Sequence, residues 1–297
     1  MKRLPFLITL FFVVLQTVSA QISNKEREAL VDIYNATEGK YWTSSWDLNR
    51  PVSEWKGVWI DKGRVTGLIL FRNNLNGIIP KSIGNLEHLE VLNLAFNKLE
   101  GELPSSITKL SKLKTMNLEM NRIGGKLPSK IGNLTSLKKF VVFNNHFVGE
   151  IPESVGKMKN LEVLNISSNN LKGEIPNSIG NLEQLESLGL FENDLDGEIP
   201  SEMGKLVKLE ELVLANNRLF GDIPKEFTGM ASLRVLQLQN NKFKSFKSLK
   251  YMSENSFLVF DFDGKEKDFE FIDLKKVKSR LADTKFEDEE EGKEEKK

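Results

Sequence analysis

The chain has 297 residues, and its 42 Lys and Arg balance its 42 Asp and Glu, so the formal net charge is zero at pH 7. This balance provides no overall basic field, so no nucleic-acid partner is expected. The lack of cysteine excludes disulfides, thiolate zinc sites and cysteine nucleophiles, and two histidines are too few for a histidine-rich metal cage.

The first twenty residues have the pattern of a secretory signal peptide. Lys2 and Arg3 precede the apolar run 4–15, and Val18-Ser19-Ala20 supplies the small residues of a cleavage site. The alternative is an uncleaved membrane anchor, but the run is shorter than the roughly 20 residues that span a bilayer. We therefore expect export, no transmembrane helix after cleavage, and a secreted or cell-surface protein.

Residues 21–64 are expected to form an N-terminal cap. Ser23-Asn24-Lys25-Glu26 is a capping box, which predicts a helix that begins there and ends near Gly39. A buried aromatic cluster would account for the tryptophans that follow, and a sugar-binding site is the alternative. All four tryptophans of the chain lie in this segment: Trp42, Trp46, Trp55 and Trp59.

A period of 24 residues organises residues 65–250 into eight repeats. Asparagine recurs at 73, 97, 121, 145, 169, 193, 217 and 241, with apolar residues five and three positions before it and two after it. Alternating apolar positions predict a short strand with one buried face. Because one repeat cannot enclose a core by itself, these strands are expected to stack in parallel.

The other recurring residues predict how each repeat turns. The asparagine amide can donate and accept, so we expect it to be buried against backbone groups where the chain leaves the strand. In the first seven repeats glycine follows four positions later and permits a positive φ, and proline follows seven positions later and is expected to hold an extended return segment that is not helical. The eighth repeat has Ser245 and Ser248 at these positions, so the array is expected to end there.

This pattern, L-x-L-x-x-N-x-L-x-G-x-I-P-x-x-I-G-x-L-x-x-L, resembles the plant-type leucine-rich repeat over about residues 27–250. The resemblance implies an α/β repeat fold: a right-handed solenoid with a parallel sheet on its concave side. Trp55-Lys56-Gly57-Val58 is similar to the W-x-G-V motif of that family's cap. Ser53 and Ile60 stand where the family has two cysteines, so the cap must be held without a disulfide.

Residues 251–282 are expected to form a C-terminal cap resembling a β-hairpin. Residues 257–262 read as a strand, Asp263-Gly264 as a turn and 269–272 as a return strand. A calcium loop is the alternative for 261–264, although its glycine comes too early for an EF-hand. Residues 283–297 are acidic and predict a disordered, solvated tail, with a partner-binding tail as the alternative.

Candidate binding residues are the strand positions that face the concave side. In the first four repeats these positions are largely apolar, which predicts a contiguous interaction surface. The later repeats are more polar there, and Phe191 is expected to stand alone. The candidate partner-binding residues are Ile69, Phe71, Phe96, Met120, Val141, Phe143 and Phe191.

The residues favour a monomeric recognition protein over an enzyme. No Ser/His/Asp set, carboxylate pair or phosphate-binding loop is evident, so no catalytic residue, cofactor or metal site is assigned. His88 and His146 are expected at the surface, and Asn35, Asn133 and Asn165 begin N-x-[ST] sequons.

The family that the repeat resembles includes receptor ectodomains, polygalacturonase-inhibiting proteins and secreted bacterial proteins. That resemblance implies binding of a protein, or else of a polysaccharide or cell-surface ligand. The alternatives are inhibition of an extracellular hydrolase and surface adhesion.

Overall fold

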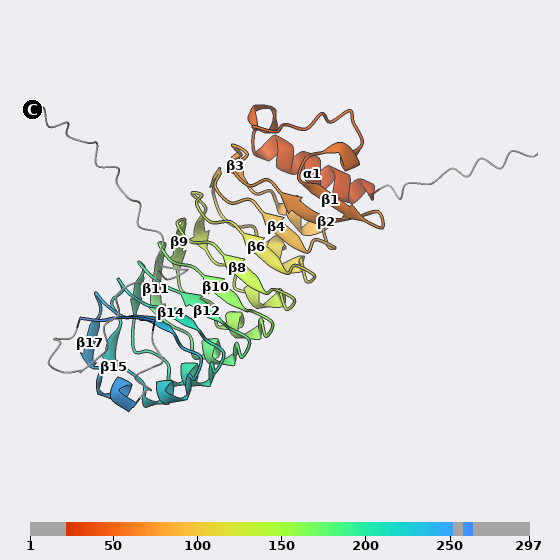
Figure 1. Cartoon of the computed structure of the whole chain (residues 1–297). Helices are drawn as coiled ribbons and strands as arrows, with labels where there is room; N and C mark the ends of the chain where they lie inside the picture. Colours follow the sequence, from red (N-terminus) through yellow and green to blue (C-terminus); the bar gives the residue numbers. More distant parts are fainter. Residues whose placement is uncertain (1–21, 252–257, 264–297) are drawn as a thin grey trace, which may run out of the picture.

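The computed structural model describes residues 22–251 and 258–263, which form a curved stack of coils (Figure 1). The predicted signal peptide at 1–20, the predicted return strand at 269–272 and the acidic tail at 283–297 lie outside the described residues. Within the described ranges, no helix is long and apolar enough to cross a membrane.

Helix α1, Asn24–Ala36, begins where the sequence predicts. Ser23 Oγ accepts a hydrogen bond from the Glu26 N–H at 3.3 Å, and Glu26 Oε2 accepts one from the Ser23 N–H at 3.2 Å. This is a complete capping box. The helix buries Leu30 and Ile33 and ends at Ala36, because Thr37 caps it and Gly39 already belongs to the next turn.

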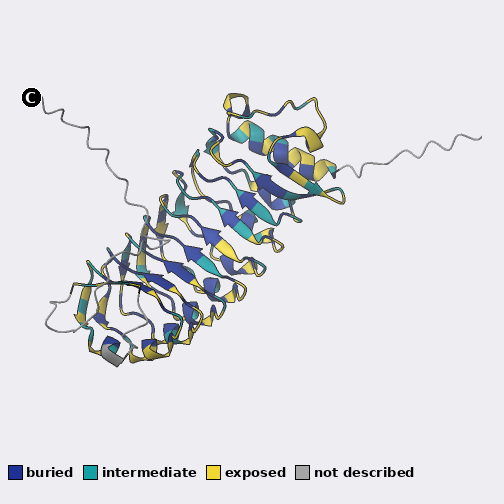
Figure 2. Ribbon diagram, in the orientation of Figure 1, coloured by how far each residue is buried: buried dark blue, intermediate teal, exposed yellow. Residues whose placement is uncertain are grey.

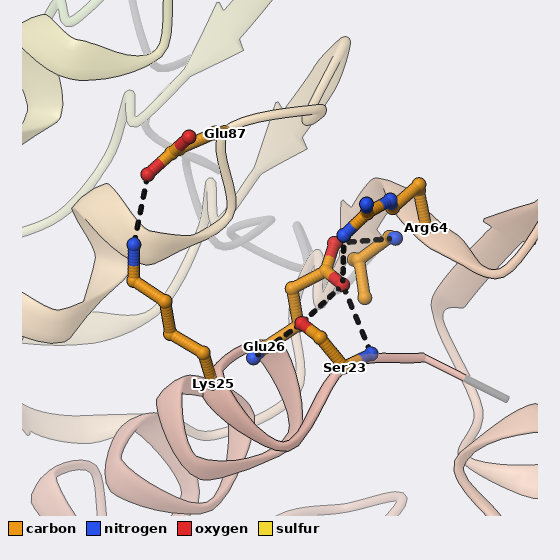
Figure 3. A network of polar contacts seen from close by, with 6 residues as sticks. Ser23, Lys25, Glu26, Arg64 and Glu87 are labelled. Carbon is orange, nitrogen blue, oxygen red and sulfur yellow. Dashed lines mark hydrogen bonds and ion pairs between the residues drawn. The ribbon is translucent and has the colours of Figure 1, made fainter.

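Glu26 joins this helix to strand β2, Arg64–Ile69 (Figure 3). The residue is only 2% exposed. Its Oε1 accepts from the Val65 N–H at 3.1 Å, and Arg64 Nη1 lies 3.6 Å from its Oε2. Because a buried carboxylate needs donors, these contacts determine how α1 packs on the first coil.

We expect Glu26→Ala to lower the free energy of unfolding by about 2 kcal/mol, since it leaves the N–H groups of Ser23 and Val65 without their acceptor. Urea unfolding followed by circular dichroism measures the change. The control is Glu28→Ala in the same helix, because Glu28 is exposed. Equal unfolding midpoints for the two variants would contradict the structural role of Glu26.

Three of the four tryptophans form the buried core of the cap. The Trp46 and Trp55 rings stack with centroids 4.8 Å apart, and Trp42 meets Trp46 edge-on at 4.9 Å. Their indole N–H groups donate to the backbone carbonyls of Thr37, Lys56 and Asp47. The cap also contains two 3-10 helices, η1 (Gly39–Tyr41) and η2 (Val52–Glu54).

A hairpin that the sequence analysis does not identify joins the cap to the repeats. Strand β1, Val58–Asp61, pairs antiparallel with β2 through the two-residue turn Lys62-Gly63. Both turn residues have positive φ, 48° and 70°, as tight hairpin turns require. The cap therefore covers the N-terminal edge of the repeat sheet with a strand of its own.

The main sheet has ten strands, β1 followed by nine parallel strands in chain order (Figure 1). Leu68 pairs with Leu92, and Leu92 pairs with Met116. Residues at the same repeat position, 24 residues apart, therefore lie opposite each other on neighbouring strands. The predicted parallel stacking is confirmed. The parallel strands after β2 are β4 (Val91–Asn93), β6 (Thr115–Asn117), β8 (Lys139–Val141), β10 (Val163–Asn165), β12 (Ser187–Gly189), β14 (Glu211–Val213), β16 (Val235–Gln237) and β18 (Val259–Asp261).

Shorter parallel sheets follow the turn in each coil. They pair β3 with β5, β7 through β13 in a four-stranded sheet, and β15 with β17. Their bounds are β3 (Asn76–Ile78), β5 (Lys98–Glu100), β7 (Gly124–Lys126), β9 (His146–Gly149), β11 (Asn170–Glu174), β13 (Asp194–Asp196), β15 (Phe220–Asp222) and β17 (Lys242–Ser245).

The predicted asparagine ladder is confirmed. Asn145 Oδ1 accepts from the Ile123 N–H of the preceding coil at 2.9 Å. Its Nδ2 donates to the carbonyls of Leu118, in the preceding coil, and Val142, in its own coil, at 3.0 and 3.1 Å. Each ladder asparagine therefore connects two neighbouring coils through buried backbone groups.

The segment after each repeat proline differs from the extended return that the sequence predicts. Proline itself is extended, with φ −73° and ψ 156° at Pro80, but a 3-10 helix begins at the next residue. Proline before the first helical turn is compatible with a helix because its missing N–H has no helical partner there. The 3-10 helices of the repeats are η3 (Lys81–Asn85), η4 (Ser105–Lys109), η5 (Ile131–Asn133), η6 (Glu153–Lys157), η7 (Asn177–Asn181), η8 (Ser201–Lys205), η9 (Lys225–Gly229) and η10 (Lys247–Tyr251). Helix η5 begins three residues after Pro128, and η10 follows no proline.

One continuous apolar core runs through the coils and includes the cap tryptophans. In Figure 2 buried residues follow the strands, while exposed residues gather along the outer turns. Phe140 and Phe147 are the largest side chains buried in the central repeats. The side chains on the concave face of the main sheet therefore do not belong to the core and are available for contacts with other molecules.

The C-terminal strand continues the repeat sheet. Strand β18 lies parallel to β16, with Leu236 opposite Phe260, and Asp263 Oδ2 accepts from the Asn241 N–H at 3.1 Å. The predicted strand within 257–262 is present, but it adds a further repeat-like strand at the end of the array. Asp261 lies in this strand, and the turn expected at Gly264 lies outside the described residues.

Candidate functional site

An exposed aromatic pair lies on the concave face near the N-terminal end of the repeats. Phe71 and Phe96 are 48% and 41% exposed, and their rings meet edge-on with centroids 5.2 Å apart. We call these two residues the aromatic pair. Ile69 lies half-buried at the end of β2, two residues before Phe71, and Met120 lies half-buried one repeat after Phe96. The structure therefore brings four of the predicted residues to one end of the face.

Trp59 extends this apolar surface, although the sequence analysis assigns it to the buried cap. It is 53% exposed on β1, opposite Gly67 on β2. A Cβ on Gly67 would lie 2.8 Å from the Trp59 ring, so the indole lies over this glycine. The signal that could have revealed it is the hairpin turn at Lys62-Gly63, which brings β1 next to the first repeat strand.

Basic and polar side chains lie beside Phe96 of the aromatic pair. A shallow, open depression of about 460 Å³ beside Phe96 is also lined by Arg72, Asn74 and Lys98. Arg72 and Lys98 are exposed. The pair therefore combines apolar area with nearby cations, a composition common at interaction surfaces.

The backbone at Phe96 and Met120 is in the left-handed region, with φ 57° and 56°. This conformation costs an L-residue other than glycine roughly 1–2 kcal/mol, and asparagine tolerates it better. Asparagine fills the same repeat position at Asn144 and Asn216, with φ 51° and 57°. The same position has a positive φ at Arg72, Ser168 and Glu192 as well, so this conformation belongs to the repeat, and Phe96 and Met120 place large apolar side chains on it.

The remaining predicted residues lie elsewhere on the face. Val141 is buried, 5% exposed, because neighbouring side chains cover it, so it is not part of an exposed patch. Phe143 is half-buried beside it. The expectation that Phe191 stands alone is wrong, since Phe191 packs against buried Val213 and Val235 on the next two strands.

A central hollow of about 330 Å³ opens on the concave face along strands β8, β10, β12 and β14. Burial raises the pKa of the Glu119 carboxyl above its ordinary value, and its own backbone N–H and the Lys139 ammonium oppose the shift. The sequence analysis did not identify this hollow, whose residues come from different columns of the repeat. Its lining is Glu119, Lys139, Val141, Phe143, Val163, Asn165, Glu186, Ser187, Glu210 and Glu211.

The three sequons are not equivalent in the fold. Asn35 and Asn133 are exposed on the cap helix and on the convex side. Asn165 is 5% exposed, and its Oδ1 accepts from the Ser167 N–H at 3.1 Å. A glycan on Asn165 is therefore incompatible with the folded coil, and the concave face stays clear of it.

Comparison with known proteins identifies the repeat. Residues 69–146 and 139–258 match the family described as "Leucine-rich repeat region", which covers more than half of the chain. The chain belongs to the leucine-rich repeat family. Its predicted plant-type character is confirmed by the relatives it matches.

A stretch of 93 residues is 36% identical to phytosulfokine receptor 2 of Arabidopsis thaliana, covering 30% of this chain and 9% of the receptor. The crystal structure of PEPR1–AtPEP1 is 26% identical with a TM-score of 0.72, covering 81% of this chain and 36% of that one. The structure of the Arabidopsis receptor kinase HAESA with the peptide hormone IDA and the co-receptor SERK1 is 27% identical, with a TM-score of 0.65. It covers 81% of this chain and 45% of that one, so this chain spans less than half the length of all three.

Proposed function

We propose that this leucine-rich repeat protein is a non-enzymatic recognition module that binds a peptide segment of a protein partner on the N-terminal half of its concave face. The observation that carries the proposal is the exposed aromatic pair on the concave face. Aromatic side chains are frequent hot spots of interfaces. A rigid array of coils also loses little conformational entropy on binding.

The relatives support this assignment by analogy of fold. The HAESA structure contains a peptide hormone bound to a leucine-rich repeat receptor. The proposal extends peptide recognition to this chain and places it outside the cell, in line with the signal peptide expected at residues 1–20. In this function the protein acts as a monomer, either secreted or retained at the cell surface.

The test is the double variant Phe71→Asn/Phe96→Asn. Random peptides displayed on phage are selected on the immobilised full chain, and the affinities of the selected peptides are measured for each variant. We expect the double variant to bind at least about tenfold more weakly, since each buried aromatic anchor contributes about 1–2 kcal/mol. Its unfolding free energy should not fall, because asparagine relieves the strain at position 96.

Phe220→Asn is the matched control, because Phe220 is 42% exposed on β15, away from the concave face. It should leave peptide affinity unchanged. Selected peptides that bind Phe71→Asn/Phe96→Asn as tightly as the wild type would refute the proposed site, and so would a selection that enriches no peptide.

A further inference from the structure

The central hollow is rich in hydrogen-bond acceptors and poor in cations. Its wall carries the carboxylates of Glu119, Glu186, Glu210 and Glu211 against the single ammonium of Lys139. In the part of the chain that the structure describes, no ion pair involves the carboxylates of Glu119, Glu186 or Glu210. The wall therefore has more carboxyl groups than cations, although the Lys138 ammonium also interacts with Glu186.

Two buried oxygens in or next to the hollow have no hydrogen-bond partner among the described residues. Glu119 Oε2 belongs to a lining residue, and the Oγ of Ser167, a residue that is 3% exposed, lies next to the lining residue Asn165. Ser167 Oγ and Asn165 Oδ1 lie 2.9 and 2.8 Å from the point that a Cβ on Gly189 would occupy. Both side chains therefore lean over the bare backbone of β12, and Asn165 itself lines the hollow.

A buried oxygen without a donor is unfavourable, and a ligand with N–H groups would supply that donor. A ligand that fits the hollow should therefore carry a hydrogen-bond donor, and the carboxylates favour a donor with a positive charge. Within 22–251 and 258–263 the structure shows no group of three or more His, Asp or Glu placed to hold a metal ion.

The apolar residues of the wall further restrict the class of ligand that fits. Val141, Phe143 and Val163 line the same hollow as the carboxylates. Lysine and arginine side chains have an aliphatic stem that packs on apolar surface and a terminal cation that binds carboxylates. A wall with both characters fits one such side chain.

We infer that the central hollow binds the side chain of a lysine or arginine from the peptide segment that crosses the concave face. This inference rests on the proposed function and adds the chemistry of its ligand. The aromatic pair lies on the first two repeats, and the lining of the hollow runs from the third repeat to the seventh, centred on the fifth. Strands spaced about 4.8 Å apart separate the two centres by about 17 Å, which an extended peptide spans in about five residues.

The inference predicts the composition of the peptides selected on the wild-type chain. They should carry a lysine or arginine about five positions from an aromatic or aliphatic residue. The double variant Glu186→Gln/Glu210→Gln should bind these peptides at least about tenfold more weakly, because charge-assisted hydrogen bonds are lost. Lys139→Gln should bind them more tightly, because it removes a repelling cation.

The matched control is Glu28→Gln/Glu183→Gln, which makes the same charge change at exposed positions on α1 and after the convex helix η7. It should bind like the wild type. If all these variants bind equally, or if the selected peptides lack a basic residue, the hollow does not have this role. Should such peptides still lose affinity for Phe71→Asn/Phe96→Asn, the proposed function stands and only this inference fails.

Discussion

Replacing Asn169 with alanine is expected to lower the free energy of unfolding by about 3–5 kcal/mol. Asn169 Oδ1 accepts from the Phe147 N–H at 3.0 Å, and Nδ2 donates to the carbonyls of Val142 and Ile166 at 3.1 Å each. Alanine would leave several buried backbone groups unpaired, at about 1–3 kcal/mol each. Urea unfolding followed by far-UV circular dichroism measures the effect.

The adjacent substitution Asn170→Ala is the control. Asn170 is exposed on β11 and lies outside the ladder, so we expect a change within about 0.5 kcal/mol. If both alanine variants unfold at the same urea concentration, the ladder does not connect the coils in the way described.

Trp46→Ala is expected to lower the free energy of unfolding by about 3–5 kcal/mol, as large-to-small substitutions at buried aromatic positions do. Trp46 is 4% exposed and lies between Trp42 and Trp55, so its loss removes the middle ring of the cap core. Coils at the end of an array depend on their cap. We therefore expect tryptophan fluorescence to report cap unfolding before circular dichroism reports loss of the repeats.

The comparison variant is Trp59→Ala. Trp59 is 53% exposed, so its replacement should reduce stability by less than about 1 kcal/mol. A Trp46→Ala protein that unfolds in one step at the wild-type midpoint would show that the aromatic core does not hold the cap.

Most of the repeat fold follows from spacing in the sequence. The asparagine period fixes which residues face the core, and the buried ladder at Asn145 and Asn169 has the predicted donors and acceptors. The 3-10 helices were not predicted, since a proline excludes helix only before itself and the turn that follows depends on how neighbouring coils pack.

The site was harder to predict than the fold. The exposure of Phe71 and Phe96 follows from their repeat positions, because the pattern defines which side of the strand is free. The burial of Val141 and the packing of Phe191 on Val213 depend on side chains of other strands. Periodicity within one repeat carries no information on such lateral neighbours, and for the same reason it did not predict the central hollow.

The ladder also limits how this array can change in length. Because each asparagine amide serves the coil before it, adding or removing a whole unit of 24 residues restores the same bonds at the junction. An insertion or deletion of one residue would bring a different side chain into that buried position. Such proteins can thus lengthen or shorten their inner surface only in discrete steps of one strand spacing, about 4.8 Å.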